Sequence, residues 1–179
     1  MGKIVVPMYI TLDGVMEKPA WSAPYWNEEV ENFQNTLLHA CDSLLLGRVT
    51  YEEFAEYWPT AKDEQGFAER MNSLPKFVAS QTLETSEWNA TFLKGDVVEE
   101  VKKLKQNDHN MLVYGSAMLV QTLLDHDLVD ELHLIICPLV LGEGKRLFKE
   151  GQAQKKFSLG ISKDTATGVV ISSYVAAEI

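Results

Sequence analysis

Four apolar segments of the chain each end in a short motif of glycine or polar residues, and these motifs offer the chemistry of the sequence. Glycine, serine and threonine beside a helix start supply backbone N–H groups and hydroxyls that bind phosphate. An arginine adds positive charge, and an aspartate can hold or transfer a proton. The motifs are Asp13-Gly14, Gly47-Arg48-Val49-Thr50, Ser80-Gln81-Thr82 and Gly115-Ser116-Ala117. Together they indicate a phosphate-containing ligand beside one candidate acid, Asp13.

Two of these motifs open a predicted helix. Thr50 and Glu53 have the T-x-x-E spacing of a capping box, which predicts a helix that begins near Tyr51. Gly115-Ser116 precedes a stripe of apolar residues at helical spacing. A helix N-terminus carries unpaired N–H groups and the positive end of the helix dipole, so it favours anions. A simpler interpretation stays open, in which Arg48 is a surface residue and the box is only a cap.

Two loops carry further candidates for substrate binding. Residues 15–26 form a predicted irregular loop that includes Trp21 and Trp26. Aromatic side chains in a loop either cover the edge of a core or wall a pocket for a flat ring, and both interpretations stay open. A glycine-bounded loop at 138–144 carries Glu143 as a second candidate carboxylate.

The apolar periodicity predicts one α/β domain over residues 1–179, with three layers (αβα) and a mixed, mostly parallel central sheet. Helices are expected at 27–39, from about 51 to Pro59, at 63–72 and 97–105, and after Gly115-Ser116, where Leu119, Val120, Leu123 and Leu124 form an apolar stripe. The C-terminal segments 157–163 and 168–176 should form an antiparallel hairpin at the sheet edge. The other strands are expected at 3–11, 43–47, 76–80, 91–93, 111–114 and 131–137.

The segment 111–148 is a strand, helix and strand in sequence. A helix of this length between two apolar strands favours a parallel pair with a right-handed crossover. The turn at Gly115 then lies at the carboxyl end of the first strand, which is where ligands bind in open α/β sheets.

Composition excludes several classes of partner. A net charge of −10 argues against nonspecific binding to nucleic acid or to an anionic membrane. The sequence has no apolar run of transmembrane length and no signal-peptide pattern at its start, so we expect a cytoplasmic protein. Cys41 and Cys137 lie in apolar runs and are expected to be reduced core thiols. The histidines form no metal-binding pattern, and no metal site is expected.

The order and wording of the motifs resemble the dihydrofolate-reductase-like superfamily, and more closely the C-terminal reductase domain of bifunctional riboflavin-biosynthesis proteins. The resemblance extends along nearly the whole chain. It rests on the segments TLDGVM, LLLGRVTYEEF, LPKFVASQTL, VYGSAMLVQTLL and LVDELHLIICPLVLGEGKRLF. The last segment is the most specific.

The resemblance implies an NADPH-dependent reductase, such as a 5-amino-6-(5-phosphoribosylamino)uracil reductase. In that family, loops like Gly47-Arg48-Val49-Thr50 and Gly115-Ser116-Ala117 hold the phosphates and the nicotinamide side. A loop like Ser80-Gln81-Thr82 reaches the adenosine 2′-phosphate region. Many relatives have arginine where this chain has Gln81, so NADH also stays open.

The substrate side of the resemblance is less complete. The closer branch of the family places a carboxylate like Asp13 near the substrate. Folate-reducing members have a carboxylate in the helix after the first loop, and here Glu28, Glu29 and Glu31 give no clear match. The expected substrate is therefore a small heterocycle, of pterin or pyrimidine type, or a carbonyl compound.

Two other functions remain as alternatives. A non-catalytic module that binds or senses a dinucleotide would need the same phosphate motifs without turnover. A purely structural oligomer would leave the coincidence of the four motifs unexplained. Relatives are often dimeric, so a homodimer is expected as well.

Overall fold

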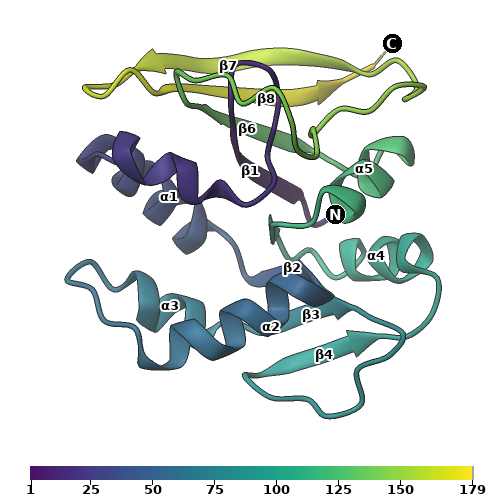
Figure 1. Ribbon diagram of the computed structural model, residues 1–179. Helices are drawn as coiled ribbons and strands as arrows, with labels where there is room; N and C mark the ends of the chain where they lie inside the picture. Colours follow the sequence, from purple (N-terminus) through teal and green to yellow (C-terminus); the bar gives the residue numbers. More distant parts are fainter. Residues whose placement is uncertain (179) are drawn as a thin grey trace.

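The computed structural model describes residues 1–178, which form one eight-stranded sheet between two layers of helices (Figure 1). The strand order is β4-β3-β2-β5-β1-β6-β8-β7, and the strands from β4 to β6 are mutually parallel. The strands are β1 (Ile4–Ile10), β2 (Ser43–Gly47), β3 (Lys76–Ala79), β4 (Ala90–Leu93), β5 (Met111–Tyr114), β6 (Glu131–Ile136), β7 (Lys156–Asp164) and β8 (Val170–Ala177).

The helices cover both faces of the sheet, as predicted for three layers. The first three α-helices pack on one face, against a core that includes Leu44, Leu46 and Leu112. The last two pack on the other face, against Val6, Met8 and Val113. The helices are α1 (Glu28–Ala40), α2 (Arg48–Tyr57), α3 (Phe67–Ser73), α4 (Val97–Lys105) and α5 (Ala117–Asp125), with short 3₁₀ helices η1 (Pro19–Tyr25) and η2 (Trp58–Thr60).

Strand β1 occupies the centre of the sheet. Its residues are buried on both faces, and it pairs with β5 on one side and β6 on the other. The predicted parallel orientation of β5 and β6 is confirmed, but the two strands are not neighbours because β1 lies between them. A strand that is apolar on both faces is the most stable occupant of that position.

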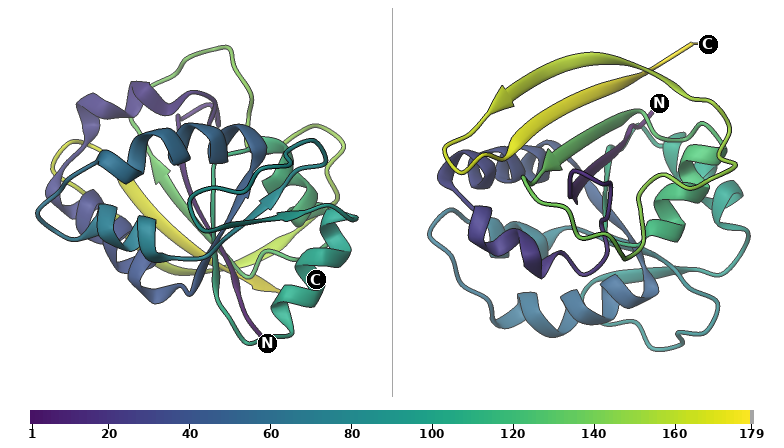
Figure 2. Two further views of the ribbon diagram at one scale, coloured as in Figure 1. Left: turned by 90° about the horizontal axis from the view of Figure 1, so that it is seen from below. Right: turned by 45° about the horizontal axis from the view of Figure 1, so that its top comes forward.

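The predicted C-terminal hairpin is confirmed. Strand β8 pairs antiparallel with both β6 and β7, so β7 forms the edge opposite β4, as the views in Figure 2 also show. Leu159 and Ile161 of β7 are 59% and 60% exposed. The hairpin therefore closes the sheet with an uncovered apolar edge.

The predicted start of α2 is wrong. The helix begins at Arg48, with Gly47 as an N-cap residue that makes no side-chain cap. Thr50 lies inside the first turn and is buried, so Thr50 and Glu53 do not form a capping box. The tertiary contact of Thr50 with the β5–α5 turn, described below, takes the place of the local cap.

Two further boundaries differ from the prediction. Residues 19–25 are not irregular but form η1. Helix α3 begins at Phe67 rather than at Asp63, because Gly66 adopts a left-handed conformation (φ +76°) and the Asp63 carboxylate accepts N–H groups ahead of the helix. Both cysteines are free and buried, as expected. Within residues 1–178, no helix is long and apolar enough to span a membrane.

Candidate functional site

The four sequence motifs lie along one edge of the sheet. They follow the carboxyl ends of β3, β2, β5 and β1, which are successive neighbours and run parallel. The Ser80 motif is therefore next to the Gly47 motif, which is next to the Gly115 motif and then to Asp13. This arrangement agrees with the edge expected from the sequence.

The Gly47 and Gly115 motifs are in direct contact. A Cβ atom on Gly115 would lie 2.1 Å from Thr50 Oγ1, and Gly115 has φ +69°. A Cβ atom on Gly47 would lie 2.7 Å from the Cβ of Ser116. Both positions thus need glycine, because only glycine lets the two backbones approach this closely. The contact brings the N-termini of α2 and α5 side by side.

Helices α2 and α5 leave this contact toward opposite faces of the sheet. A place where neighbouring parallel strands send their helices to opposite faces is a topological switch point, where ligands of open α/β sheets bind. Ser116 caps α5 by accepting the N–H of Leu119 at 3.2 Å. No side chain caps α2. The first N–H groups of α2 therefore remain suited to bind an anion.

Arg48 and Lys94 bring positive charge to the part of this edge formed by the Gly47 and Ser80 motifs. Arg48, the first residue of α2, is half exposed and pairs with Glu52 at 2.9 Å. Lys94, which follows β4, donates to the carbonyl oxygen of Leu83. Sequence analysis missed Lys94, although β4 runs parallel to β3 and ends at the same edge.

The Ser80 motif forms a turn beside Lys94. The buried Ser80 hydroxyl accepts the N–H groups of Thr82 and Leu83 at 3.3 and 3.1 Å. Gln81 Nε2 donates to the carbonyl oxygen of Gly95 at 3.0 Å. Gln81 thus connects the two turns, and the Lys94 ammonium group lies beside them.

Asp13 anchors the loop that follows β6. Its carboxylate accepts the Thr11 hydroxyl and the N–H of Gly142 at 2.8 Å, and it lies 3.6 Å from the Arg146 guanidinium. These hydrogen bonds, with that of Thr11 the largest cause, lower the pKa of Asp13 to about 2. The carboxylate is therefore ionised at neutral pH, which suits an orienting role better than proton donation. Glu143 is exposed in the same loop.

The two predicted tryptophans differ in position. Trp26 is 47% exposed and packs on Tyr9 with ring centroids 6.4 Å apart. Trp21 is turned inward, and its Nε1 donates to the carbonyl oxygen of Glu17 at 3.0 Å. Trp26 thus lies beside the sheet face that α1 covers, whereas Trp21 packs at the edge of the core.

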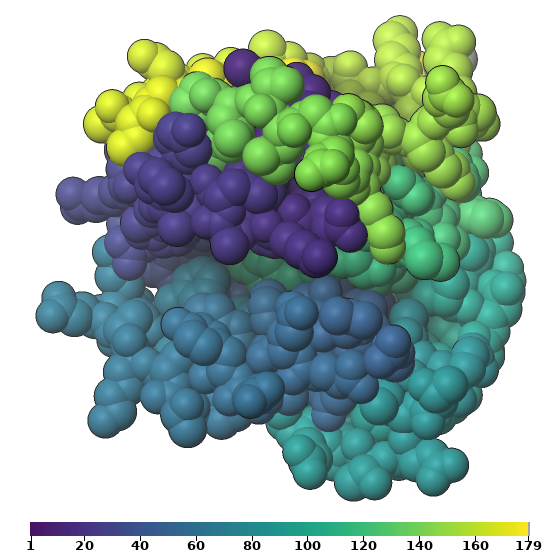
Figure 3. All heavy atoms as spheres, viewed as in Figure 1, coloured from purple at the N-terminus to yellow at the C-terminus, as the bar shows by residue number. Residues whose placement is uncertain are grey.

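A groove separates α1 from α2, the helices that cover the same face of the sheet, on the side of the molecule seen in Figure 3. Tyr114, the last residue of β5, points to the same sheet face and meets Phe54 of α2 at 5.9 Å between ring centroids. Gln34 of α1 is 5% exposed, and its side chain tends to lower the pKa of Tyr9. Burial raises the pKa of Tyr9 to about 12 and also raises that of Tyr114, so both phenols are neutral.

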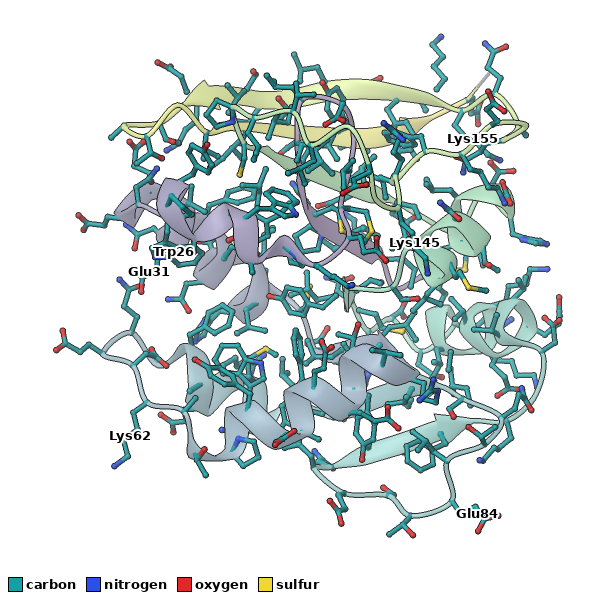
Figure 4. The ribbon with its side chains drawn as sticks, in the orientation of Figure 1. Trp26, Glu31, Lys62, Glu84, Lys145 and Lys155 are labelled. Atoms are coloured by element: carbon teal, nitrogen blue, oxygen red, sulfur yellow. The ribbon has the colours of Figure 1, made fainter. Side chains whose placement is uncertain are left out.

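Sequence analysis did not single out Gln34 or Tyr114. A glutamine within a helix and a tyrosine at a strand end are common in structural positions, so neither gave a signal. The carboxylates of α1 are placed differently: Glu28 is exposed and Glu29 pairs with Lys163 at 3.1 Å. Glu31, in the first turn of α1, is half-buried and lies above the loop that carries Lys62 in the view of Figure 4.

Other regions carry little chemistry. A cavity of about 420 Å³ lies between the end of α5 and the start of β7, away from the motif edge. Among residues 1–178, no group of three or more His, Cys, Asp or Glu side chains is arranged to hold a metal ion.

Comparison with known proteins agrees with this architecture. The YyaP protein of Bacillus subtilis, described as uncharacterized, is 30% identical over 172 residues, which are 94% of this chain and 92% of that protein. A structure from Shewanella sp. PV-4, named provisionally as a riboflavin biosynthesis protein, has a TM-score of 0.80 at 23% identity, covering 99% of this chain and 100% of that one.

Two structures of named enzymes share the fold. The deaminase/5-amino-6-(5-phosphoribosylamino)uracil reductase of Thermotoga maritima has a TM-score of 0.70 at 14% identity, covering 98% of this chain and 57% of that one. Dihydrofolate reductase of Enterococcus faecalis, solved with NADP(H), has a TM-score of 0.61 at 14% identity, covering 99% and 98%. The family model of the RibD C-terminal domain matches residues 2–171. The chain shares the fold of these two proteins and belongs to the RibD C-terminal domain family.

Proposed function

We propose that this protein is an NADPH-dependent reductase that delivers hydride to a small heterocycle, of pterin or pyrimidine type, or to a carbonyl compound. The contact between the starts of α2 and α5 carries the proposal. Two adjacent helix N-termini at a switch point suit the pyrophosphate of a dinucleotide. Family membership supports the reductase class, and NADP(H) is named with the Enterococcus dihydrofolate reductase.

The residues at the edge fit a dinucleotide. Gly47 and Gly115 leave no room for side chains, so the backbone N–H groups are accessible at close range. Arg48 would pair with a phosphate, and Lys94 with the 2′-phosphate that distinguishes NADPH from NADH. Ser80 and Ser116 provide hydroxyls, and Thr82 an exposed one beside them.

When bound, the dinucleotide supplies the hydride, and the protein sets distance and surroundings. The groove between α1 and α2 would hold the substrate ring, with Trp26 at its side. Asp13, directly or through a water, would orient the substrate from the neighbouring strand end. Glu143, in the loop that Asp13 anchors, remains a candidate second contact.

Fluorescence titration with NADPH tests the proposal. Wild-type protein should bind NADPH saturably. Arg48→Ala should raise the dissociation constant about 10-fold, because a charged hydrogen bond is lost. Lys94→Ala should reduce the preference for NADPH over NADH, and the exposed Lys62→Ala serves as a control. If the wild type did not bind NADPH saturably, both the assignment of NADPH as cofactor and the proposed reductase activity would be refuted.

A dinucleotide-binding module without turnover is the second candidate. The engagement of Asp13 with Arg146 and the Gly142 N–H favours it, since the site then has no evident proton donor at neutral pH. Saturable NADPH binding with no NADPH oxidation across a panel of pterins, pyrimidines and carbonyl compounds would select this function.

A further inference from the structure

Gln121 of helix α5 connects this helix to the loop that follows β6. Its Nε2 donates to the carbonyl oxygens of Arg146 and Leu147, at 3.0 and 3.3 Å. A carboxamide nitrogen carries two N–H groups, one for each of these carbonyl oxygens. The half-buried Gln121 side chain therefore fixes the loop to the helix through two hydrogen bonds.

Arg146 extends this connection to Asp13. Its Nε donates to the Asp13 carbonyl oxygen at 3.0 Å, and a terminal nitrogen of the guanidinium lies 3.6 Å from the Asp13 carboxylate. The backbone of Arg146 also pairs with that of Val15 in an antiparallel bridge. The next residue, Leu147, donates its N–H to the carbonyl oxygen of Gly14 at 3.0 Å. The loop after β6 and the loop after β1 are thus joined around Asp13.

The Asp13 carboxylate accepts two of its hydrogen bonds from the same loop. The donors are the N–H groups of Leu141 and Gly142, at 3.3 and 2.8 Å. The hydroxyl of Thr11 also donates to it, but that bond is local, because Thr11 and Asp13 belong to the same turn. The two bonds from Leu141 and Gly142 require that the loop after β6 be held in place. The position of Asp13 and part of its low pKa therefore depend on the loop that Gln121 fixes.

Helix α5 also forms the cofactor side of the proposed site. Its first residue, Ala117, follows the close contact between the Gly47 and Gly115 turns. Gln121 lies four residues further along, which is about one helical turn, or about 6 Å along the axis. An α-helix is stiff over this length. A ligand at the start of α5 and the loop bound to Gln121 therefore keep a constant separation.

We propose that Gln121 is a positioning residue of this reductase, which sets the Asp13 carboxylate at a fixed place relative to the cofactor helix α5. The inference rests on the proposed function, because it takes the start of α5 as the dinucleotide site and Asp13 as the residue that orients the substrate. Gln121 acts through Arg146 and the loop after β6 rather than by contact with either ligand. Misplacement of an orienting group by about 1 Å lowers turnover by up to about 10²-fold.

NMR spectroscopy of the full chain, without added ligand, tests the placement of Asp13 in Gln121→Leu, which lacks both N–H donors. In the wild type, the carboxyl carbon shift should show that Asp13 stays ionised down to its pKa of about 2. In the variant, the pKa of Asp13 should rise from about 2 toward the ordinary 3.8, because N–H donors that favour the carboxylate are lost. Hydrogen exchange of the Gly142 amide should become about 10-fold faster, the value of one hydrogen bond.

Two further variants separate positioning from general stability. Gln121→Lys retains N–H donors on a side chain of sufficient reach, so it should restore the wild-type pKa of Asp13 and the wild-type exchange of Gly142. Thr122→Val is the matched control, because the Thr122 hydroxyl donates to the carbonyl oxygen of Met118 within α5. It should leave both signals unchanged, even if it lowers the melting temperature as much as Gln121→Leu does.

Titration with NADPH keeps this inference distinct from the proposed function. Wild type and Gln121→Leu should bind NADPH with the same dissociation constant, since the Gln121 side chain is bonded to the loop after β6. Failure of the wild type to bind NADPH defeats the proposed function. If the wild type binds NADPH but Asp13 and Gly142 behave in Gln121→Leu as in the wild type, the positioning role is overturned. Equal changes in Thr122→Val would overturn it as well.

Discussion

Lys76, the first residue of β3, is fully buried, and no carboxylate among residues 1–178 pairs with it. Its Nζ donates to the carbonyl oxygen of Asn72 at 2.9 Å and lies 4.0 Å from the ring centroid of Trp88. Burial lowers its pKa from 10.5 to about 8. The carbonyl and the aromatic face offset only part of the cost of desolvating the ammonium group.

Stability should therefore depend on pH through Lys76. Between pH 8 and 10.5 the unfolded chain binds a proton that the folded protein has released, so the free energy of unfolding rises with pH across this window. Lys76→Met should abolish this rise, which amounts to about 1–3 kcal/mol. Urea denaturation at pH 7, 8.5 and 10 measures it, with the exposed Lys62→Met as control. Parallel pH profiles for wild type and Lys76→Met would contradict the expectation.

Asp13 is a second residue whose charge state decides its role. Because its pKa is held at about 2, the pH-rate profile of a turnover assay between pH 5 and 9 should not carry an Asp13 limb. Asp13→Asn should lower kcat/KM by up to about 10²-fold through misplacement of the loop, without changing the profile's shape. The exposed Asp108→Asn is the control. Loss of one limb of the profile in Asp13→Asn would show proton transfer instead.

At the scale of elements, the turn between β5 and α5 packs closely against the turn between β2 and α2. Each glycine in this contact excludes a side chain because the partner turn occupies the space. The sequence correctly predicted that strands end at the glycine and serine motifs, because apolar runs and turn residues are local signals. It misplaced the start of α2 because the burial of Thr50 against Gly115 depends on a residue 65 positions away.

Gly115→Ala should disrupt this contact. The new Cβ would lie 2.1 Å from Thr50 Oγ1 in a left-handed backbone conformation, so we expect a loss of about 1–3 kcal/mol in stability and at least a 10-fold weaker NADPH affinity. Gly66→Ala is the matched control, because Gly66 has φ +76° and no atom would lie within 4 Å of its new Cβ. Equal effects of the two variants on NADPH binding would contradict a role for the interlocked turns.

For the whole molecule, the layer arrangement followed from the sequence, but the groove did not. Strand and helix periodicity fix which faces are buried, and so predict three layers. The groove forms only when α1 and α2 pack on the same face of the sheet, which no local pattern encodes. Lys94 was missed for a similar reason, since it joins the motif edge only through the pairing of β3 with β4.

The exposed edge of the hairpin bears on assembly, and we propose that the protein forms a homodimer through it. Leu159 and Ile161 are exposed on β7, which has an unpaired edge among residues 1–178. Light scattering should detect a dimer, and Leu159→Lys/Ile161→Lys should convert it to a folded monomer. Thr91→Lys on the opposite edge strand should leave the mass unchanged. A monomeric wild type at high concentration would refute the dimer.

The central position of β1 also constrains how the chain acquires its structure. The first strand to leave the ribosome pairs only with strands that begin at residues 111 and 131. Neither partner strand has been synthesised when the first hundred residues are complete. Strand β1, which is apolar on both faces, therefore stays unpaired until most of the chain has been made. Completion of the sheet is therefore a late, long-range event, and truncation before residue 136 leaves β1, the strand that leads to Asp13, without its full pairing to β6.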